Sequence, residues 1–468
     1  MPPLIIAVGG TGKGTLLVYK RMANLLGDSA ESLVFDVPYG GEPIDFALSA
    51  EGVDPHRFLT LIPAGLPLNE ALVLDDILGI KDTVDKNERE LKEEVAQVFF
   101  KPEQRRTRII DGMNCEPVVG ATMAARKLVD KKDQHYRMLK DEVAKSDDVI
   151  LVGSITGGTG SGAIPALASW LSNRGKAVYG VLYLPWLDIS SATAAGGANN
   201  MTMRRNAGAV LNYLKDQDQA TNPDSAYGYI FDYYLLLGPT TAAGAADGLP
   251  PIASDRARGD LHPLFLAGAV YLLQFEGIKK KRPAGARGPH VVQLNRGLRP
   301  EQIECQGTNL QVAVKRARLR MRALESIAAL LPDQALSFAT VFPRPLAWPA
   351  LTESIRNLTD KYGGRSQVHR AWVGVRETLV REAAAEGERV EALANVSKQD
   401  PNRVVFDFDW TAIFNAADSQ ATETTQKIKD RFRPFDPASG RSQEAAIEEL
   451  SRTVIQQVRI VVAERVRQ

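Results

Sequence analysis

A run of glycine and hydroxyl residues between an apolar strand and an apolar helix is the segment best suited to chemistry. Val149–Val152 is apolar, and Thr156-Gly157-Gly158-Thr159-Gly160-Ser161-Gly162 comes shortly after it. Glycines at this density let the backbone approach a ligand and turn its N–H groups inward. A helix that follows from Ala163 adds the partial positive charge of its N-terminus. The segment therefore predicts a phosphate-binding loop, and a flexible Gly/Ser turn is the alternative.

A second glycine-rich segment follows the apolar strand predicted at Leu4–Val8. It reads Gly9-Gly10-Thr11-Gly12-Lys13-Gly14-Thr15. A Walker A loop would need glycine at the position of Ala7, and a dinucleotide fingerprint would need glycine at the position of Thr15. The segment is therefore neither of these motifs. Lys13 is either a phosphate contact or a solvated lysine.

Alternating strands and helices must position both loops. Further strands are predicted at Ser32–Phe35, Ala177–Leu184 and Tyr229–Leu237, and helices at Leu16–Leu26, Ala121–Ala144, Ala163–Leu171, Met201–Lys215 and Pro263–Ile278. Such alternation is typical of parallel βαβ units with helices on both faces of the sheet. In such a sheet ligands bind outside the carboxyl ends of the strands, where both loops would lie. We expect an α/β fold with a Rossmann-like parallel sheet, followed by a central helix and a divergent, helix-rich C-terminal region.

Composition narrows the classes of partner. The chain has 57 Lys and Arg against 56 Asp and Glu, which argues against nucleic acid as a partner. Its two cysteines are far apart, which favours a reducing cytoplasm, and its five histidines have no metal-ligand spacing. No signal peptide and no apolar run of about 20 residues is present, so we expect a cytoplasmic protein without a membrane span or a bound metal of its own.

The segment at 156–162 resembles the signature loop of the tubulin/FtsZ superfamily. Gly157 to Gly162, followed by Ala163 and Pro165, matches that loop, and Thr156 stands where the family usually has another glycine. With Val152-Gly153-Ser154 ahead of it, the phrase is most similar to the divergent bacterial tubulin-like proteins. The segment at 9–14 likewise resembles the first nucleotide loop of tubulin and FtsZ. The resemblance implies a pocket for GTP or GDP, with Mg²⁺.

The resemblance also implies roles outside the two loops. Asp36 matches the loop that approaches the phosphates and their Mg²⁺, with a turn cap as the alternative. Asp188 lies near the family's ribose-binding carboxylate, and Arg205 resembles the arginine at the start of the next helix; either is otherwise a surface charge. His262 or Asp260 stands where the family places a polar group against the base, and a helix cap is the alternative for His262. The predicted nucleotide-binding residues are thus Gly9, Gly10, Thr11, Gly12, Lys13, Asp36, Thr156, Gly157, Gly158, Thr159, Gly160, Ser161, Gly162, Asp188, Arg205 and His262.

The segment after the predicted central helix departs from the family. In tubulin and FtsZ it contributes an acidic residue that positions the attacking water at the nucleotide of the next subunit. Gly277–Pro300 contains no Asp or Glu, and the nearest acids beyond it are Glu301 and Glu304. The segment instead carries Lys279, Lys280, Lys281, Arg282, Arg287, Arg296 and Arg299, which form a solvated loop or a patch for an acidic partner. No catalytic residue is assigned, and we expect nucleotide occupancy rather than efficient hydrolysis.

The resemblance covers residues 1–280. The structure of the C-terminal part is therefore predicted only from its composition and from the spacing of its apolar residues. We expect a nucleotide-binding domain over 1–260, a connecting helix over 261–280, a second domain or basic connecting region over 281–341, and a helix-rich region over 342–468. Helices are predicted at Val312–Leu331, Val375–Val396 and Ser442–Val466. The last carries an apolar stripe that packs on the body of the protein or on a helical partner. Two functions remain: a self-assembling nucleotide-binding protein with weak GTPase activity, or a non-catalytic sensor or interaction protein acting through these helices.

Overall fold

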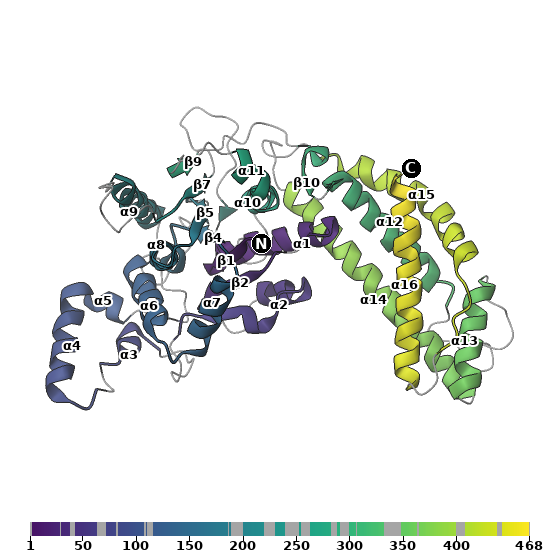
Figure 1. Cartoon of the computed structure of the whole chain (residues 1–468), viewed down its shortest axis with the longest axis horizontal. Helices are drawn as coiled ribbons and strands as arrows, with labels where there is room; N and C mark the ends of the chain where they lie inside the picture. The colour runs from purple at the N-terminus through teal and green to yellow at the C-terminus, as the bar shows by residue number, and fades with distance from the viewer. Residues whose placement is uncertain are drawn as a thin grey trace. The chain divides into compact units, whose positions relative to one another are not determined.

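The computed structural model of the chain divides into two compact units (Figure 1). One comprises Met1–Leu298 with Val396–Phe406, and the other comprises Arg299–Asn395 with Asp407–Gln468. The structure describes residues 2–28, 30–37, 43–62, 72–80, 83–106, 109, 116–185, 187–188, 200–219, 230–238, 252–253, 263–281, 288–290, 299–305, 307–331, 348–362, 365–398, 408–437 and 442–467.

A parallel sheet forms the centre of the first unit. Its described strands lie in the order β3-β2-β1-β4-β5-β7-β9, and each neighbouring pair is parallel. Every residue of β1 and β4 is buried, as expected for strands covered by helices on both faces. The strands are β1 (Leu4–Val8), β2 (Ser32–Asp36), β3 (Phe58–Thr60), β4 (Asp148–Ser154), β5 (Ala177–Tyr183), β7 (Tyr233–Leu237) and β9 (Gly288–His290). The predicted α/β class with a Rossmann-like sheet is confirmed.

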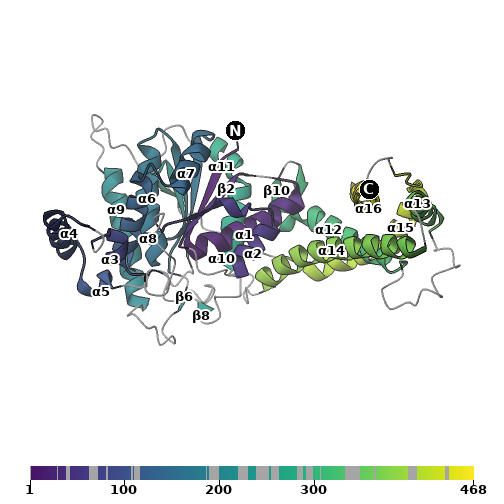
Figure 2. The same cartoon turned by 90° about the horizontal axis from the view of Figure 1, so that it is seen from below.

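Helices cover both faces of this sheet (Figures 1 and 2). Helix α1 packs against α10 on one face, and α8 packs against α6 on the other. The described helices of this unit are α1 (Gly9–Leu26), α2 (Pro43–Ala50), α3 (Leu74–Leu78), α4 (Lys86–Phe99), α5 (Pro102–Arg105), α6 (Pro117–Val129), α7 (Gln134–Ala144), α8 (Gly158–Ser172), α9 (Asn200–Gln219), α10 (Pro263–Leu273) and α11 (Phe275–Lys281).

Three predicted elements have different bounds in the structure. The segment 9–15, expected as a loop, forms the first two turns of α1. The helix expected over Ala121–Ala144 is two helices, α6 and α7, because the chain turns at Asp130–Asp133. The predicted central helix appears as α10 and α11, and Gln274 joins them through a hydrogen bond from its N–H to the Val270 carbonyl (3.0 Å).

The second unit is built from helices around its own apolar core. Its described helices are α12 (Leu310–Ala328), α13 (Pro349–Tyr362), α14 (Arg365–Lys398), α15 (Trp410–Arg431) and α16 (Gln443–Arg467), with a short antiparallel pair β10 (Glu304–Cys305) and β11 (Thr308–Asn309) before α12. The predicted apolar stripe of α16 is buried within this unit, where Leu450, Val454 and Val458 join a core shared with α12, α13 and α15. The sequence reading missed α13 and α15.

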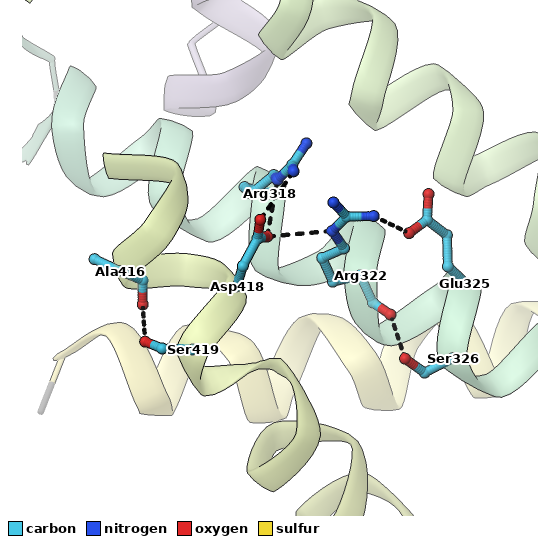
Figure 3. Close-up of polar contacts among 7 residues, drawn as sticks. All are labelled: Arg318, Arg322, Glu325, Ser326, Ala416, Asp418 and Ser419. Carbon is cyan, nitrogen blue, oxygen red and sulfur yellow. Dashed lines mark hydrogen bonds and ion pairs between the residues drawn. The ribbon is translucent and has the colours of Figure 1, made fainter. Parts of the chain in front are cut away.

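Arginines of α12 tie this helix to α15 and α14. Arg318 donates from Nε and Nη2 to the two carboxylate oxygens of Asp418, each at 2.9 Å (Figure 3). Arg322 donates to the same carboxylate at 3.2 Å and to Glu325 at 2.9 Å. Arg320 pairs with Glu386 at 3.0 Å. The basic face of α12 is therefore largely engaged inside its own unit.

None of the helices in the described part of the chain combines the length and the apolar character needed to cross a lipid bilayer.

Candidate functional site

The two glycine-rich turns lie against each other at the carboxyl edge of the sheet. Strands β1 and β4 are adjacent, with Val8 opposite Gly153, so the segments that leave them start side by side. A Cβ atom built on Gly9 would lie 3.4 Å from the Cβ atom of Thr159 and 3.9 Å from the amide nitrogen of Gly160. Two segments far apart in the sequence thus form one site.

Each turn is the start of a helix whose first N–H groups receive no side-chain cap. Val8 precedes α1 and Gly157 precedes α8, and neither makes a capping side-chain hydrogen bond. Neither helix has an acidic residue in its first turn. The first N–H groups of a helix have no partner within the helix, so those of α1 and α8, together with the two helix dipoles, favour an anion at the same edge of the sheet.

Several glycines of the two turns serve packing rather than ligand contact. A Cβ on Gly12 would lie 2.4 Å from the Val152 carbonyl oxygen, and one on Gly160 would lie 2.0 Å from the Ser154 carbonyl oxygen. A Cβ on Gly162 would lie 2.1 Å from the Pro117 carbonyl oxygen. These glycines let α1 and α8 approach the strands and α6 more closely than any side chain would permit.

Two glycines differ from the others because they face open space. No atom of the described residues lies within 4 Å of a Cβ built on Gly10 or on Gly157. Gly10 is exposed and Gly157 is half-buried. Among the glycines of the two turns whose surroundings the structure describes, Gly10 and Gly157 are therefore the ones with room for a phosphate beside the backbone.

The hydroxyl groups of the second turn point inward and hold its shape. The side-chain oxygens of Ser154 and Thr156 are 2.6 Å apart, and the Thr156 N–H donates to the Ser154 hydroxyl at 3.2 Å. Ser161 donates its hydroxyl to the Gly157 carbonyl. Thr156, which stands in place of a family glycine, is buried and therefore acts as a brace within the turn.

Asn206 of α9 is a site residue that the sequence reading missed. Its side-chain nitrogen donates to the Thr156 carbonyl at 2.9 Å, and the residue is buried. The neighbouring Arg205, which was the predicted residue, is exposed. Asn206 follows two exposed arginines and belongs to no recognisable sequence motif. Only its position on the buried face of α9 could have indicated that it contacts the turn.

Lys13 is buried between two carboxylates, and its reading as a solvated lysine is wrong. Its ammonium nitrogen lies 3.1 Å from Oδ2 of Asp36 and 3.2 Å from Oδ1 of Asp45, and the side chain is 2% exposed. The other oxygen of Asp36 accepts the Val37 N–H at 2.8 Å. The predicted residues Lys13 and Asp36 are thus brought together, and Asp45 of α2 is a partner that the sequence reading did not find.

A buried tyrosine braces the far side of α1. Thr15 donates its hydroxyl to the Tyr183 hydroxyl at 2.8 Å, and Tyr183 donates to the Leu264 carbonyl at 3.3 Å. Burial raises the pKa of Tyr183 above its ordinary value, so the phenol stays neutral. This chain of hydrogen bonds fixes α1 relative to β5 and α10.

The remaining predicted residues are placed only in part. Asp188 lies in β6 (Leu187–Asp188), which pairs with β8 (Ile252–Ala253), and its side chain lies outside the described residues. His262 and Asp260 also lie outside them. In the basic segment, Lys279 belongs to α11 and pairs with Asp148, so this residue is not part of a solvated loop.

One comparison with known proteins covers the signature turn. A family model described as "Tubulin like" matches residues 104–231, which contain β4, the turn at 156–162, α8 and α9. Among solved structures, the chain is similar to the GDP-bound monomer of CetZ1 from Haloferax volcanii, with 13% identity and a TM-score of 0.29 over 51% of each chain. The chain therefore matches about half the length of that protein, and no curated protein matches it. The family model confirms the predicted resemblance to the tubulin/FtsZ superfamily over residues 104–231.

Proposed function

We propose that the chain binds a guanine nucleotide, with its phosphates at the N-termini of α1 and α8. The observation that carries this proposal is the contact between the two uncapped helix starts at Gly9 and Thr159. A single helix N-terminus stabilises an anion by roughly 0.3–1 kcal/mol, and two that converge on one anion act together. The open faces of Gly10 and Gly157 leave room for the phosphate oxygens.

The choice of a guanine nucleotide rests on the tubulin-like match and on the order of residues in the two turns. GTP or GDP with Mg²⁺ is the expected ligand, and Asp188 and His262 remain the proposed contacts for the ribose and the base. The polar groups that hold the Thr156–Gly162 turn, from Ser154 and Asn206, support the proposal because they keep its backbone in one conformation before any ligand arrives.

We favour a protein that binds the nucleotide but does not hydrolyse it efficiently. The sequence offers no Asp or Glu between Gly277 and Pro300, where tubulin and FtsZ supply the acid that positions water. The chain then acts as a weak GTPase, with self-assembly, or as a nucleotide-dependent sensor that engages a partner through its C-terminal helices. The second form is favoured by a separate helical core in the second unit.

The experiment that tests the binding site places a carboxylate where the phosphates are proposed to bind. Gly157 precedes α8 with φ −81° and ψ 169°, which any residue adopts, so Gly157→Asp fits the backbone. The new side chain is a good N-cap for α8 and accepts the N–H groups intended for phosphate. We expect thermal stability to be unchanged or raised, while the affinity for a fluorescent GTP analogue falls by about 100-fold or more.

The matched control is Gly277→Asp, which adds the same charge to an exposed glycine of α11 with no described atom within 4 Å of its Cβ. Its neighbour Lys279 pairs with Asp148, the first residue of β4, so the control lies toward the opposite edge of the sheet. Its affinity should equal that of the wild type. Equal affinity of wild type and Gly157→Asp would refute the proposed site.

A further inference from the structure

Lys13 and its two carboxylates connect three elements beside the glycine-rich turns. Lys13 comes from the second turn of α1, Asp36 from the last position of β2, and Asp45 from the first turn of α2. Because β1 and β2 are parallel, with Val8 opposite Phe35, Asp36 lies at the same sheet edge as the start of α1. The side chains of Asp36 and Asp45 are 16% and 25% exposed, and that of Lys13 is 2% exposed.

This arrangement does not fit Asp36 as a direct ligand of the Mg²⁺ that, according to the family resemblance, its loop approaches. Mg²⁺ binds carboxylate oxygens at about 2.0–2.1 Å and keeps several water molecules. Oδ2 of Asp36 already faces the Lys13 ammonium at 3.1 Å, and Oδ1 accepts the Val37 N–H at 2.8 Å. A divalent ion on either oxygen would therefore lie close to a fixed positive charge in a poorly solvated place, where repulsion between cations is strong.

We propose that the Lys13 ammonium is a tethered cation that takes the place of a divalent metal ion at Asp36. A metal ion and a lysine serve the same purpose here, because either one neutralises carboxylates at the edge where phosphates would bind. The tether keeps that charge in place whatever the metal concentration. It follows that nucleotide binding does not depend on a divalent ion at Asp36, and that removing the lysine side chain leaves a pair of carboxylates able to bind one.

The first test uses the wild-type protein and rests on the proposed nucleotide binding. Affinity for a fluorescent GDP analogue is measured in Mg²⁺ and in excess EDTA. We expect EDTA to change the affinity of the wild type and of Asp36→Asn by the same factor, within about threefold, and a loss of more than about tenfold in the wild type that Asp36→Asn abolishes would overturn the proposal. If no nucleotide binds in either buffer, the proposed function fails, and the second test still decides the role of Lys13.

The second test needs no nucleotide. Binding of Mn²⁺ alone is followed by electron paramagnetic resonance in the wild type, in Lys13→Met and in the double variant Lys13→Met/Asp45→Asn. Met fills the volume of the lysine stem without its charge. We expect Lys13→Met to bind Mn²⁺ and to gain thermal stability from it, whereas the wild type shows neither effect and the double variant binds at least about tenfold more weakly.

The wild type keeps the proposal falsifiable if Lys13→Met does not fold. A Mn²⁺ signal from the wild-type protein that disappears in Asp36→Asn would show that the lysine does not exclude a metal ion, and would overturn the proposal. A folded Lys13→Met variant that binds no Mn²⁺ would overturn it as well.

Discussion

Each unit of the molecule contains a charge cluster, and the two clusters have opposite patterns. In the first unit one lysine, Lys13, lies between two aspartates, and its side chain is 2% exposed. In the second unit one aspartate, Asp418, lies between Arg318 and Arg322, and its side chain is 35% exposed (Figure 3). The first cluster is thus largely removed from water and the second remains in contact with it.

The difference in solvation indicates different purposes for the two clusters. Removing charges from water is costly, and a buried ion pair often stabilises a fold no better than apolar residues would. The Lys13 cluster lies beside the two open glycine turns, where the lysine reduces the repulsion between its two carboxylates and a phosphate. The Asp418 cluster connects α12 and α15 over the surface of a helical core, where solvent screens the charges and little is gained or lost.

The largest expected effect comes from breaking the buried cluster. Lys13→Met removes the cation that Asp36 and Asp45 share, and breaking a buried ion pair typically costs about 3–5 kcal/mol. Arg318→Met is the matched variant in the other cluster and should cost at most about 1 kcal/mol, because Arg322 still pairs with a solvated Asp418. Hydrogen exchange followed in each unit during mild urea unfolding measures both losses. Equal costs would remove the distinction between the clusters.

A smaller loss of stability is expected from removing the uncharged side chain of Asn206, which supports the turn at the same site. Asn206→Ala removes the donor to the Thr156 carbonyl and leaves a buried acceptor unpaired, which costs about 1–3 kcal/mol. Nucleotide affinity should fall with it, because the turn loses its fixed conformation. Arg204→Ala is the matched control, and since Arg204 is exposed and is not a predicted contact we expect neither stability nor affinity to change. Loss of affinity in Arg205→Ala alone would instead favour the role that the family resemblance implies.

Local patterns in the sequence predicted the elements that carry the site. The apolar runs at Leu4–Val8 and Val149–Val152 and the glycine turns after them have strong short-range signals, and both strands were found. What the sequence could not reveal is which glycines face a ligand. Gly12 and Gly160 contact backbone atoms of β4, whereas Gly10 and Gly157 face open space, and this division depends on the packed fold.

The sequence also could not reveal contacts between residues that lie far apart in the chain. Lys13, Asp36 and Asp45 become neighbours only when α1, β2 and α2 assemble, so no local spacing indicates the burial of Lys13. Helices α13 and α15 were missed for a related reason. Pro349 begins α13 as a helix-starting proline, which reads as a linker, and α15 is rich in polar residues whose apolar positions are recognised only against α12 and α16.

The smallest predicted effect concerns pH and the exposed cluster. Hydrogen bonds from Arg318 and then Arg322, opposed by partial burial, hold the pKa of Asp418 below its ordinary value of 3.8. A carboxyl with a depressed pKa stabilises the fold fully above its unfolded pKa and loses that contribution as the pH falls through the folded pKa. The difference in stability between wild type and Asp418→Asn should therefore be at most about 1 kcal/mol at pH 7 and should vanish as the pH falls below the folded pKa of Asp418.

Hydrogen exchange in the presence of GDP reports directly on the backbone N–H groups that are proposed to bind the phosphates. We predict slower exchange on GDP binding in peptides that cover residues 9–14 and 156–162, with little change in the described helices α15 and α16 of the second unit. Binding of GDP without protection of either glycine-rich turn would contradict the proposed binding site.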